Sequence, residues 1–372
     1  MSKWAVWLPI LLLIWAGGVV HAVELVETTA HQRVILHAGP SHTYSPVDVL
    51  DSSLPVQIVE RNDIGNWVRV ERHDLRGNIV QNGWLMLGYL DIPAELKFSR
   101  IPATDLPAAD LDNIGSRSMR LLYEAPVVPA LGQQMQTVYD KGKRMGRDSQ
   151  VITKVGDSLS ADYVYLAAMA ERERSLGPYD YLAPTVDYYG ASTAQASLAA
   201  QVGLSSVVVL DPFWADLSLC EPNETLLECE YRRKNPAVAL IMFGPNDVIG
   251  MGHEQYGQNM RRITERTMEL GVIPVLSTFS YSPDHELWQK SVDFNLQLVE
   301  IADEYQVPLI NLWAASRPLE SYGLARDFVH MKQSGFPYLK LDSGHETFYG
   351  STLRNLLAIR TLHEIRTTLE LE

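Results

Sequence analysis

A serine stands at the turn between a predicted strand and a predicted helix. Residues 151–155 are mostly apolar and β-branched, which indicates a buried strand, and this strand stops at Gly156-Asp157-Ser158. Apolar residues at helical spacing then predict a helix over 161–174. Glycine permits a sharp turn, and the N–H groups of a first helical turn can stabilise an oxyanion. Ser158 is therefore placed as a nucleophile or, in the alternative, as a simple helix N-cap.

A second polar group follows another buried strand. The apolar run 236–243 is typical of a strand covered on both faces, and it leads directly into Gly244-Pro-Asn-Asp247. Asn246 in this block could offer its amide N–H to an oxyanion. The alternative is an ordinary turn, because residues of these types are common turn formers.

Two Asp-x-x-His pairs lie near the end of the chain and compete as the acid and base of a triad. One is Asp327 with His330, and the other is Asp342 with His345. The three-residue spacing suits a single loop that places the carboxylate against the imidazole and the imidazole against the serine.

These blocks and their order resemble those of the SGNH (GDSL) hydrolases, and the resemblance covers the chain from residue 151 to its end. It implies a flavodoxin-like α/β/α domain with a parallel sheet. It also implies a triad of Ser158, His330 and Asp327, and no cofactor or metal. The implied oxyanion hole consists of the Ser158 N–H, a glycine N–H and the Asn246 side chain.

The choice of triad pair rests on neighbouring residues. The apolar Val329 before His330 and the aromatic Phe336 after Gly335 resemble the family's usual Asp-Gly-Val-His…Gly-Tyr pattern. We therefore favour Asp327 with His330 and keep the second pair as the alternative.

The oxyanion glycine has two candidates, Gly203 and Gly190, and both lack the asparagine that the family commonly places five residues earlier. We prefer Gly203, because a helix beginning at Ser205 or Ser206 would direct its N–H groups at the site.

The remaining pattern downstream of residue 243 alternates predicted helices and strands. Helices are predicted over 253–270, 285–305 and 350–369, and strands over 272–279 and 307–312. Such alternation indicates a parallel sheet with helices on both faces. In such sheets the ligand lies beyond the carboxyl ends of the strands, where both polar blocks fall.

The chain divides into four predicted parts. Residues 1–22 combine Lys3, an apolar run and Val-His-Ala, as in a cleaved secretory signal peptide. Residues 23–95 alternate as short strands, 96–150 form a proline-containing lead-in with one helix over 135–143, and 151–372 form the α/β domain. The mature protein is thus expected to be periplasmic or secreted.

The second part resembles a bacterial SH3-like β-barrel domain. The resemblance rests on residues 33–40, on Gly65-Asn-Trp-Val-Arg-Val70 and on Gly83-Trp84. It implies a cell-wall polymer as a possible partner, and a docking module without a ligand is the alternative.

Charge and cysteine content narrow the classes of function. Among 372 residues, Asp plus Glu is 45 and Lys plus Arg is 31, so the net charge of −14 disfavours nucleic acid and anionic lipid as partners. The two cysteines, Cys220 and Cys229, are expected to form a disulfide in an oxidising compartment, worth roughly 2.5 kcal/mol. Neither has a His or Cys partner at zinc spacing.

The sequence therefore predicts a secreted serine esterase that acts through an acyl-enzyme. Its substrate is expected to be an acyl ester, with an O-acetyl group on a cell-wall or other carbohydrate favoured. The alternatives are a lipid acyl-ester hydrolase and a non-catalytic wall-binding protein on the same scaffold.

Overall fold

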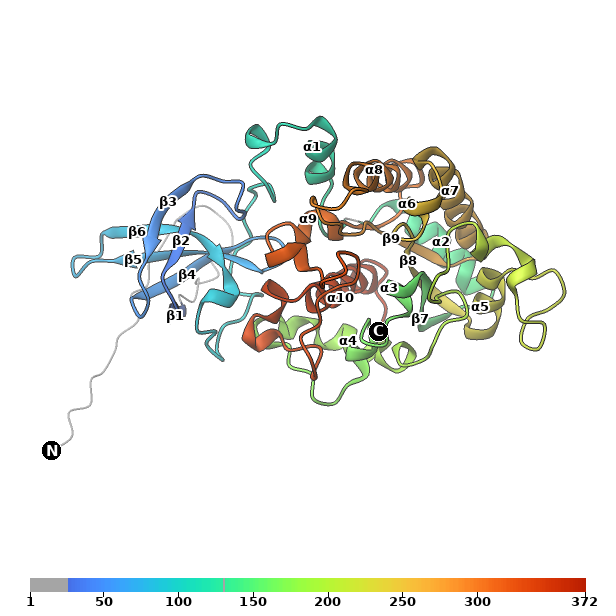
Figure 1. Cartoon of the computed structure of the whole chain (residues 1–372). Coiled ribbons are helices and arrows are strands. Elements are labelled where there is room, and N and C mark those ends of the chain that lie inside the picture. The colour runs from blue at the N-terminus through green and yellow to red at the C-terminus, as the bar shows by residue number, and fades with distance from the viewer. Residues whose placement is uncertain (1–25, 130) are drawn as a thin grey trace.

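The computed structural model describes residues 26–129 and 131–372, and the predicted signal peptide lies outside them. Figure 1 shows a β unit in blue at the amino-terminal end and a larger α/β unit, with the last helix in red near the middle of the molecule. Among the described residues, no helix is both long and apolar enough to span a membrane.

The β unit is one antiparallel sheet of six strands in the order β1-β4-β5-β6-β2-β3. The strands are β1 (Val26–Thr29), β2 (Val34–His37), β3 (Pro46–Leu50), β4 (Pro55–Arg61), β5 (Trp67–His73) and β6 (Ile79–Met86). In β4, Val56 and Ile58 are buried while the residues between them are less so, which is the alternation that the sequence pattern predicted. The structure thus has a small all-β unit where one was predicted.

The α/β unit is built on four parallel strands in the order β10-β9-β8-β7. Their bounds are β7 (Asp148–Gly156), β8 (Pro236–Met242), β9 (Ile273–Ser277) and β10 (Leu309–Ile310). The segment at Ala200 extends the sheet beside β7 through a parallel bridge to Gly156. Every residue of β8 is buried, as expected for a strand that has helices on both sides. The predicted parallel α/β architecture is confirmed.

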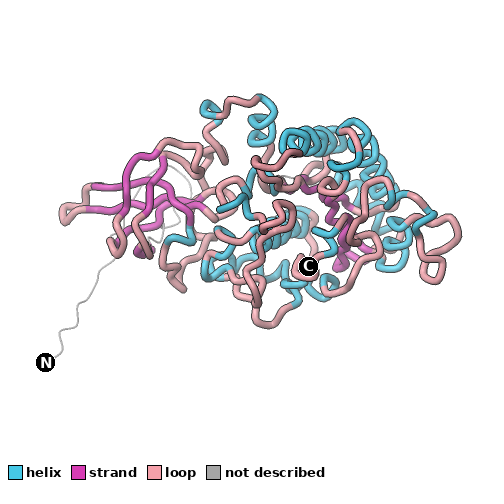
Figure 2. The backbone as a smooth tube through the Cα atoms, in the orientation of Figure 1, coloured by secondary structure: helices cyan, strands magenta, loops and turns pink. Residues whose placement is uncertain are grey.

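Helices cover both faces of this sheet. The helices are α1 (Arg117–Glu124), α2 (Gln133–Arg144), α3 (Ser158–Ala161), α4 (Ala183–Thr193), α5 (Leu226–Lys234), α6 (Asp247–Gly250), α7 (His253–Glu269), α8 (Trp288–Tyr305), α9 (Leu312–Ser316) and α10 (Gly350–Thr368). Helices α7 and α8 contact each other on one side, while α4 and α10 contact each other on the opposite side (Figures 1 and 2). The three long helices predicted downstream of residue 243 are confirmed as α7, α8 and α10.

The helix predicted over 161–174 is wrong, because the four-residue α3 ends at Ala161 and only a short 3₁₀-helix over Ala167–Ala170 follows it within that range. The side chain of Asn355, on α10, accepts a hydrogen bond from the Leu166 N–H at 2.7 Å and donates one to the Val164 carbonyl at 3.2 Å. The Lys154 ammonium donates to the Tyr165 carbonyl at 3.2 Å. These distant side chains satisfy the backbone groups that a continuing helix would have used.

Helix α10 joins the two units of the molecule. All of its residues from Gly350 to Leu362 are buried, including the cations Arg354 and Arg360. Arg360 reaches the β unit, where it forms an ion pair with the Asp63 carboxylate at 3.0 Å and donates to the Asp63 carbonyl. Arg354 points the other way and donates to the Leu159 carbonyl beside the nucleophile turn at 2.5 Å. One helix therefore contacts both the β unit and the serine turn.

A buried carboxyl group lies at the junction of the two units. Glu346 is fully buried, and one of its oxygens accepts a hydrogen bond from the Tyr179 hydroxyl at 3.1 Å. Among the described residues its other oxygen has no partner. The Tyr179 ring packs edge-on against Phe98 from the lead-in segment. Burial raises the pKa of Glu346 to about 8.

We expect the Glu346→Gln variant to be more stable than the native protein at pH 8.5 but not at pH 4. Between the unfolded pKa of about 4.3 and the folded pKa of about 8, the unfolded chain has lost this proton while the folded chain keeps it. Native stability contributed by this group therefore falls as pH rises through that window, by roughly 1.4 kcal/mol per unit of pKa displacement at most. Urea unfolding at both pH values measures the difference. The exposed Glu95→Gln variant is the control, and a stability difference that does not depend on pH would contradict the prediction.

Candidate active site

Ser158 is presented by a tight turn at the carboxyl end of β7. Gly156 has φ of 150°, and a Cβ atom there would lie 2.0 Å from the carbonyl oxygen of Met242 on β8. Only glycine fits this close approach between neighbouring strands. The Asp157 side chain caps α3 by accepting a hydrogen bond from the Leu159 N–H. The turn therefore lifts the partly exposed Ser158 off the end of the strand.

The three residues of the favoured triad form one hydrogen-bonded chain. The Ser158 Oγ lies 3.0 Å from His330 Nε2, and His330 Nδ1 lies 2.8 Å from Asp327 Oδ2. Both distances are within hydrogen-bonding range for a nucleophile, a base and a carboxylate that orients the base. Serine and histidine are 172 residues apart in the sequence, so the contact depends on the whole α/β fold.

The charge of Asp327 determines the imidazole tautomer. Burial raises the pKa of Asp327, but hydrogen bonds from the His330 and Val329 N–H groups and from the imidazole outweigh it, so the pKa lies below its usual value. An ionised carboxylate can only accept hydrogen bonds. The proton must therefore be on Nδ1 of His330, which leaves the Nε2 lone pair free to accept the Ser158 proton.

A short hairpin holds the Asp-x-x-His segment. The Ala325 N–H donates to the His330 carbonyl at 2.8 Å, and Leu324 and Met331 form an antiparallel bridge. Inside the hairpin, Asp327 Oδ1 accepts hydrogen bonds from the backbone N–H groups of His330 and Val329 at 2.9 and 3.1 Å. The same carboxylate thus fixes both the backbone and the ring of the histidine.

Three possible oxyanion donors come from neighbouring segments. Asn246 follows β8, and one hydrogen of its amide donates to the Leu204 carbonyl at 3.1 Å, while the other has no acceptor among the described residues. The Ser158 and Gly203 N–H groups also have no acceptor in the described part of the chain. The Gly156 N–H donates to the Ala199 carbonyl, and the Gln201 N–H donates to the Gly156 carbonyl. These two hydrogen bonds bring the loop before Gly203 beside the serine turn.

The structure places the two candidate oxyanion glycines, Gly203 and Gly190, in different surroundings. Gly190 lies inside α4, where its N–H is part of the helix, whereas Gly203 lies in an open turn with φ of 80°. The predicted helix start at Ser205 or Ser206 is wrong, because the next element is a short 3₁₀-helix over Val208–Leu210. The Ser206 N–H points instead to Asp247 Oδ1, at 2.9 Å.

Asp247 links the two loops that carry Gly203 and Asn246, a role that the sequence did not show. Its carboxylate accepts hydrogen bonds from the Ser206 N–H and hydroxyl and from the Gly244 N–H at 3.1 Å. Asn259 on α7 also donates to the Ser206 hydroxyl at 3.1 Å. The only sequence signal was the position of Asp247 at the end of the Gly-Pro-Asn-Asp block.

The alternative pair, Asp342 and His345, lies elsewhere. The Asp342 backbone packs against Gly177, and Gly344 packs against Gly88 of the β unit. His345 contacts the Tyr349 ring, and its buried Nδ1 has no hydrogen-bond partner among the described residues. No hydrogen bond joins it to Ser158 within the described chain, so the structure brings only the first pair to the serine.

The site is open to solvent. The side chains of His330 and Asp327 are 46% and 53% exposed. A cavity of about 350 Å³ does lie between the β unit and the α/β unit, where Trp67, Tyr123 and Ala314 are among its lining residues. None of the triad residues lines that cavity. A substrate would therefore approach the serine at the surface rather than through that cavity.

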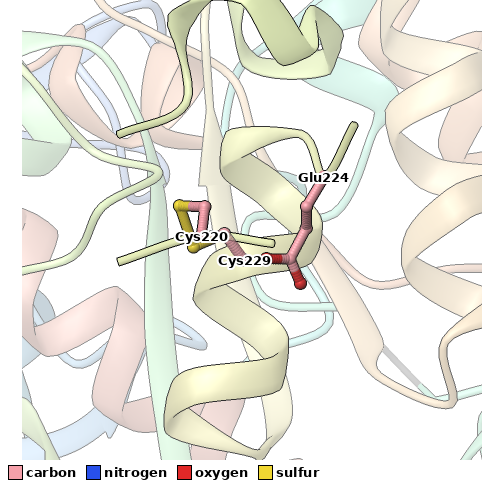
Figure 3. A group of neighbouring side chains, drawn as sticks. All are labelled: Cys220, Glu224 and Cys229. Carbon is pink, nitrogen blue, oxygen red and sulfur yellow. A yellow bond between two sulfur atoms is a disulfide. The ribbon is translucent and has the colours of Figure 1, made fainter. Parts of the chain in front are cut away.

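The predicted disulfide between Cys220 and Cys229 is present, with the two Cα atoms 5.3 Å apart. It links Cys220, in the loop that precedes α5, to Cys229 on α5. Figure 3 shows Glu224 beside the sulfur atoms, an arrangement of three groups that would otherwise suit a metal ion. The sulfurs are bonded to each other and offer no thiolate.

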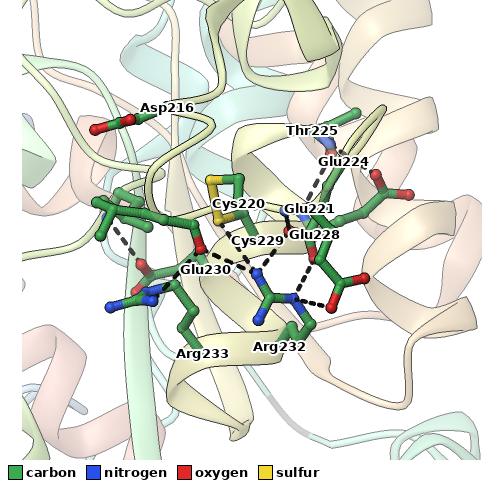
Figure 4. The surroundings of a disulfide bond; sticks show 12 residues. Asp216, Cys220, Glu221, Glu224, Thr225, Glu228, Cys229, Glu230, Arg232 and Arg233 are labelled. Carbon is green, nitrogen blue, oxygen red and sulfur yellow. Dashed lines mark hydrogen bonds and ion pairs between the residues drawn. A yellow bond between two sulfur atoms is a disulfide. The ribbon is translucent and has the colours of Figure 1, made fainter.

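The carboxylate of Glu224 is also engaged, by a neighbouring arginine. Arg232 donates to both carboxylate oxygens of Glu224, at 2.8 and 2.9 Å, and to the Leu219 carbonyl at 3.1 Å (Figure 4). The Arg232 guanidinium holds the pKa of Glu224 below its usual value. The disulfide and the Arg232–Glu224 ion pair therefore have a structural role, which is to hold the loop before α5 in place.

No protein-family model matches the chain, and no curated protein matches it. Several solved structures are similar to this chain over somewhat more than half of its length. A putative lipolytic protein of the G-D-S-L family from Desulfitobacterium hafniense is 14% identical with a TM-score of 0.37, covering 57% of this chain and 99% of that one. A variant of an acetyl xylan esterase from Geobacillus stearothermophilus is 17% identical with a TM-score of 0.35, covering 58% and 96%. A lipase/acylhydrolase from Enterococcus faecalis is 17% identical with a TM-score of 0.37, covering 58% and 95%. These scores are too low to carry an argument about function, which depends on the geometry of the site itself.

Proposed function

We propose that this protein is a serine esterase that cleaves acyl esters through an acyl-enzyme. The observation that carries the proposal is the continuous hydrogen-bonded chain from Ser158 through His330 to Asp327. A serine whose hydroxyl is bonded to an imidazole, with that imidazole oriented by an ionised carboxylate, is the constellation used for acyl transfer on many unrelated folds.

In the proposed reaction, His330 Nε2 takes the Ser158 proton while Oγ attacks the ester carbonyl carbon. The oxyanion that forms accepts hydrogen bonds from the Ser158 and Gly203 N–H groups and from the free amide hydrogen of Asn246, each worth roughly 3–4 kcal/mol. The imidazolium then gives its proton to the departing alcohol, and an acyl-enzyme remains. Water then gives a proton to the same imidazole and attacks the acyl carbon. The bond between that carbon and Ser158 Oγ breaks, the imidazolium returns the proton to Oγ, and the carboxylic acid leaves.

We further propose that the substrate is a small acyl ester, such as an acetyl group, carried by a carbohydrate outside the cytoplasm. The open site supports a bulky polymer, because both triad partners of the serine are about half exposed. The disulfide and the sequence of residues 1–22 support export. The β unit is then the candidate contact for a cell-wall polymer.

Lipid acyl esters are the second candidate. Ile249 and Val202, which lie close in sequence to the proposed oxyanion residues Asn246 and Gly203, are 69% and 83% exposed. Apolar side chains exposed beside an ester site can contact an acyl chain or a lipid surface.

Acetate release from a panel of substrates tests the proposal. The full chain would be incubated with acetylated xylan, O-acetylated peptidoglycan and an emulsified triglyceride, and acid release would be measured. We expect release from at least one acetylated glycan and labelling by a fluorophosphonate probe. Release from the triglyceride alone would favour the lipid candidate, and absence of both labelling and turnover would remove the esterase proposal in favour of a binding protein.

A further inference from the structure

Three aromatic side chains lie on the chain segments that carry the nucleophile and the base, and we call Tyr163, Phe336 and Tyr338 the aromatic lip. We propose that this lip is the subsite that binds the sugar ring bearing the scissile ester, on a neutral polysaccharide. The inference rests on the proposed esterase function and names the substrate group that the site holds.

The lip lies near the triad because two hydrogen bonds join the segment that carries Ser158 to the segment that carries His330. The first hydrogen bond joins the Ser158 hydroxyl and His330 Nε2 at 3.0 Å. The second lies a few residues further along the same segments, where the Gln333 amide donates to the Asp162 carboxylate at 3.2 Å. Tyr163 follows directly after Asp162 on the serine side. Phe336 and Tyr338 follow on the histidine side. The lip is therefore formed by the two chain segments that carry the nucleophile and the base.

Ring contacts hold the lip together while two of its three side chains remain mostly exposed. The Tyr163 and Tyr338 rings are 5.8 Å apart in an edge-on contact and their hydroxyls are 3.4 Å apart, and the Phe336 and Tyr338 rings are 5.9 Å apart. The Tyr338 N–H donates to Glu171 at 3.3 Å, which anchors the middle ring. Yet Tyr163 and Phe336 are 67% and 62% exposed. Large exposed rings held in place by their neighbours suit ligand binding better than core packing.

The chemistry of the lip fits a sugar better than an acyl chain. Its rings can stack on the C–H face of a sugar, and its phenol hydroxyls and the nearby Gln333 amide can bond sugar hydroxyls. The Glu171 carboxylate accepts a hydrogen bond from the Tyr338 N–H, and Asp162 directly precedes Tyr163 in the chain. With the net charge of −14, these carboxylates disfavour an anionic polymer. A neutral acetylated glycan offers sugar faces and hydroxyls to the rings and the polar groups, and it carries no negative charge for the carboxylates to repel.

The test separates the lip from the chemical step. We expect Phe336→Ala and Tyr163→Ala each to lower kcat/KM on acetylated xylo-oligosaccharides about tenfold, mainly through KM. Hydrolysis of p-nitrophenyl acetate, which has no sugar, should change less than about twofold. Phe336→Tyr should restore most of the glycan activity because it keeps the ring. Leu75→Ala, a fully exposed apolar residue in the turn after β5, is the control and should change neither rate.

A binding measurement keeps the inference independent of turnover. On the Ser158→Ala background, titration calorimetry with the same oligosaccharides should show weaker binding when Phe336 is also replaced. Equal losses on both substrates would indicate a merely structural role, and unchanged glycan kinetics and binding would overturn the inference. A larger effect on p-nitrophenyl octanoate than on the glycan would assign the lip to acyl chains instead. If the native protein hydrolyses neither substrate, the proposed function fails, whatever the lip does.

Discussion

Replacing Ser158 with alanine should abolish hydrolysis of p-nitrophenyl acetate, with a loss of about 10⁴-fold or more in kcat. The Ser158 hydroxyl has one described partner, His330 Nε2, and the residue is partly exposed. Removing the hydroxyl therefore deletes the nucleophile without breaking a structural hydrogen bond or leaving a buried cavity. Initial rates, labelling by a fluorophosphonate probe and a circular dichroism spectrum together measure the effect.

The control for this variant is Ser343→Ala. The Ser343 hydroxyl bonds only the neighbouring Asp342 carboxylate in the described structure, and the residue is exposed. We expect this variant to keep the native rate and the native labelling. A Ser158→Ala protein that folds and still hydrolyses the ester at the native rate would remove the serine mechanism.

Replacing His330 with alanine should lower kcat by about 10³-fold or more, whereas His345→Ala should lower it by less than about tenfold. His330 is the ring that contacts both Ser158 and Asp327, at 3.0 and 2.8 Å. His345 lies against Tyr349 near the junction with the β unit. The two histidines occur in the same sequence pattern, so each is the matched control of the other.

Kinetics of both histidine variants on p-nitrophenyl acetate, with thermal unfolding to show that each is folded, measure this difference. A reversed order of effects would transfer the role of base to His345 and that of orienting carboxylate to Asp342. It would leave the roles proposed for Ser158 and Asn246 unchanged.

Features that depend on local sequence could be predicted well. The strand before Ser158 is mostly apolar and β-branched, and the strand before Asn246 is a continuous apolar run. Each ends in residues that form turns, so β7, β8 and their polar ends follow from the pattern. The disulfide follows from there being only two cysteines.

Features that depend on distant partners could not be predicted. The segment after α3 has helical spacing, but Asn355, about 190 residues away, takes its backbone hydrogen bonds. Likewise, the Ser206 N–H is taken by Asp247 rather than opening a helix. Both Asp-x-x-His pairs have the same spacing, and only the hairpin that closes between Ala325 and His330 directs one of them to the serine. These outcomes depend on which side chains the completed fold brings near.

Helix α10 has a consequence for how a long substrate would be handled. Its buried cations contact Asp63 of the β unit at one place and the Leu159 carbonyl beside the nucleophile at another. Helix α10 is buried from Gly350 to Leu362, so both contacts are made by one enclosed element. The β unit and the serine turn are thus both attached to the same helix. If the β unit contacts the polymer that carries the ester, as proposed above, this helix would set how far along the polymer from that contact Ser158 acts.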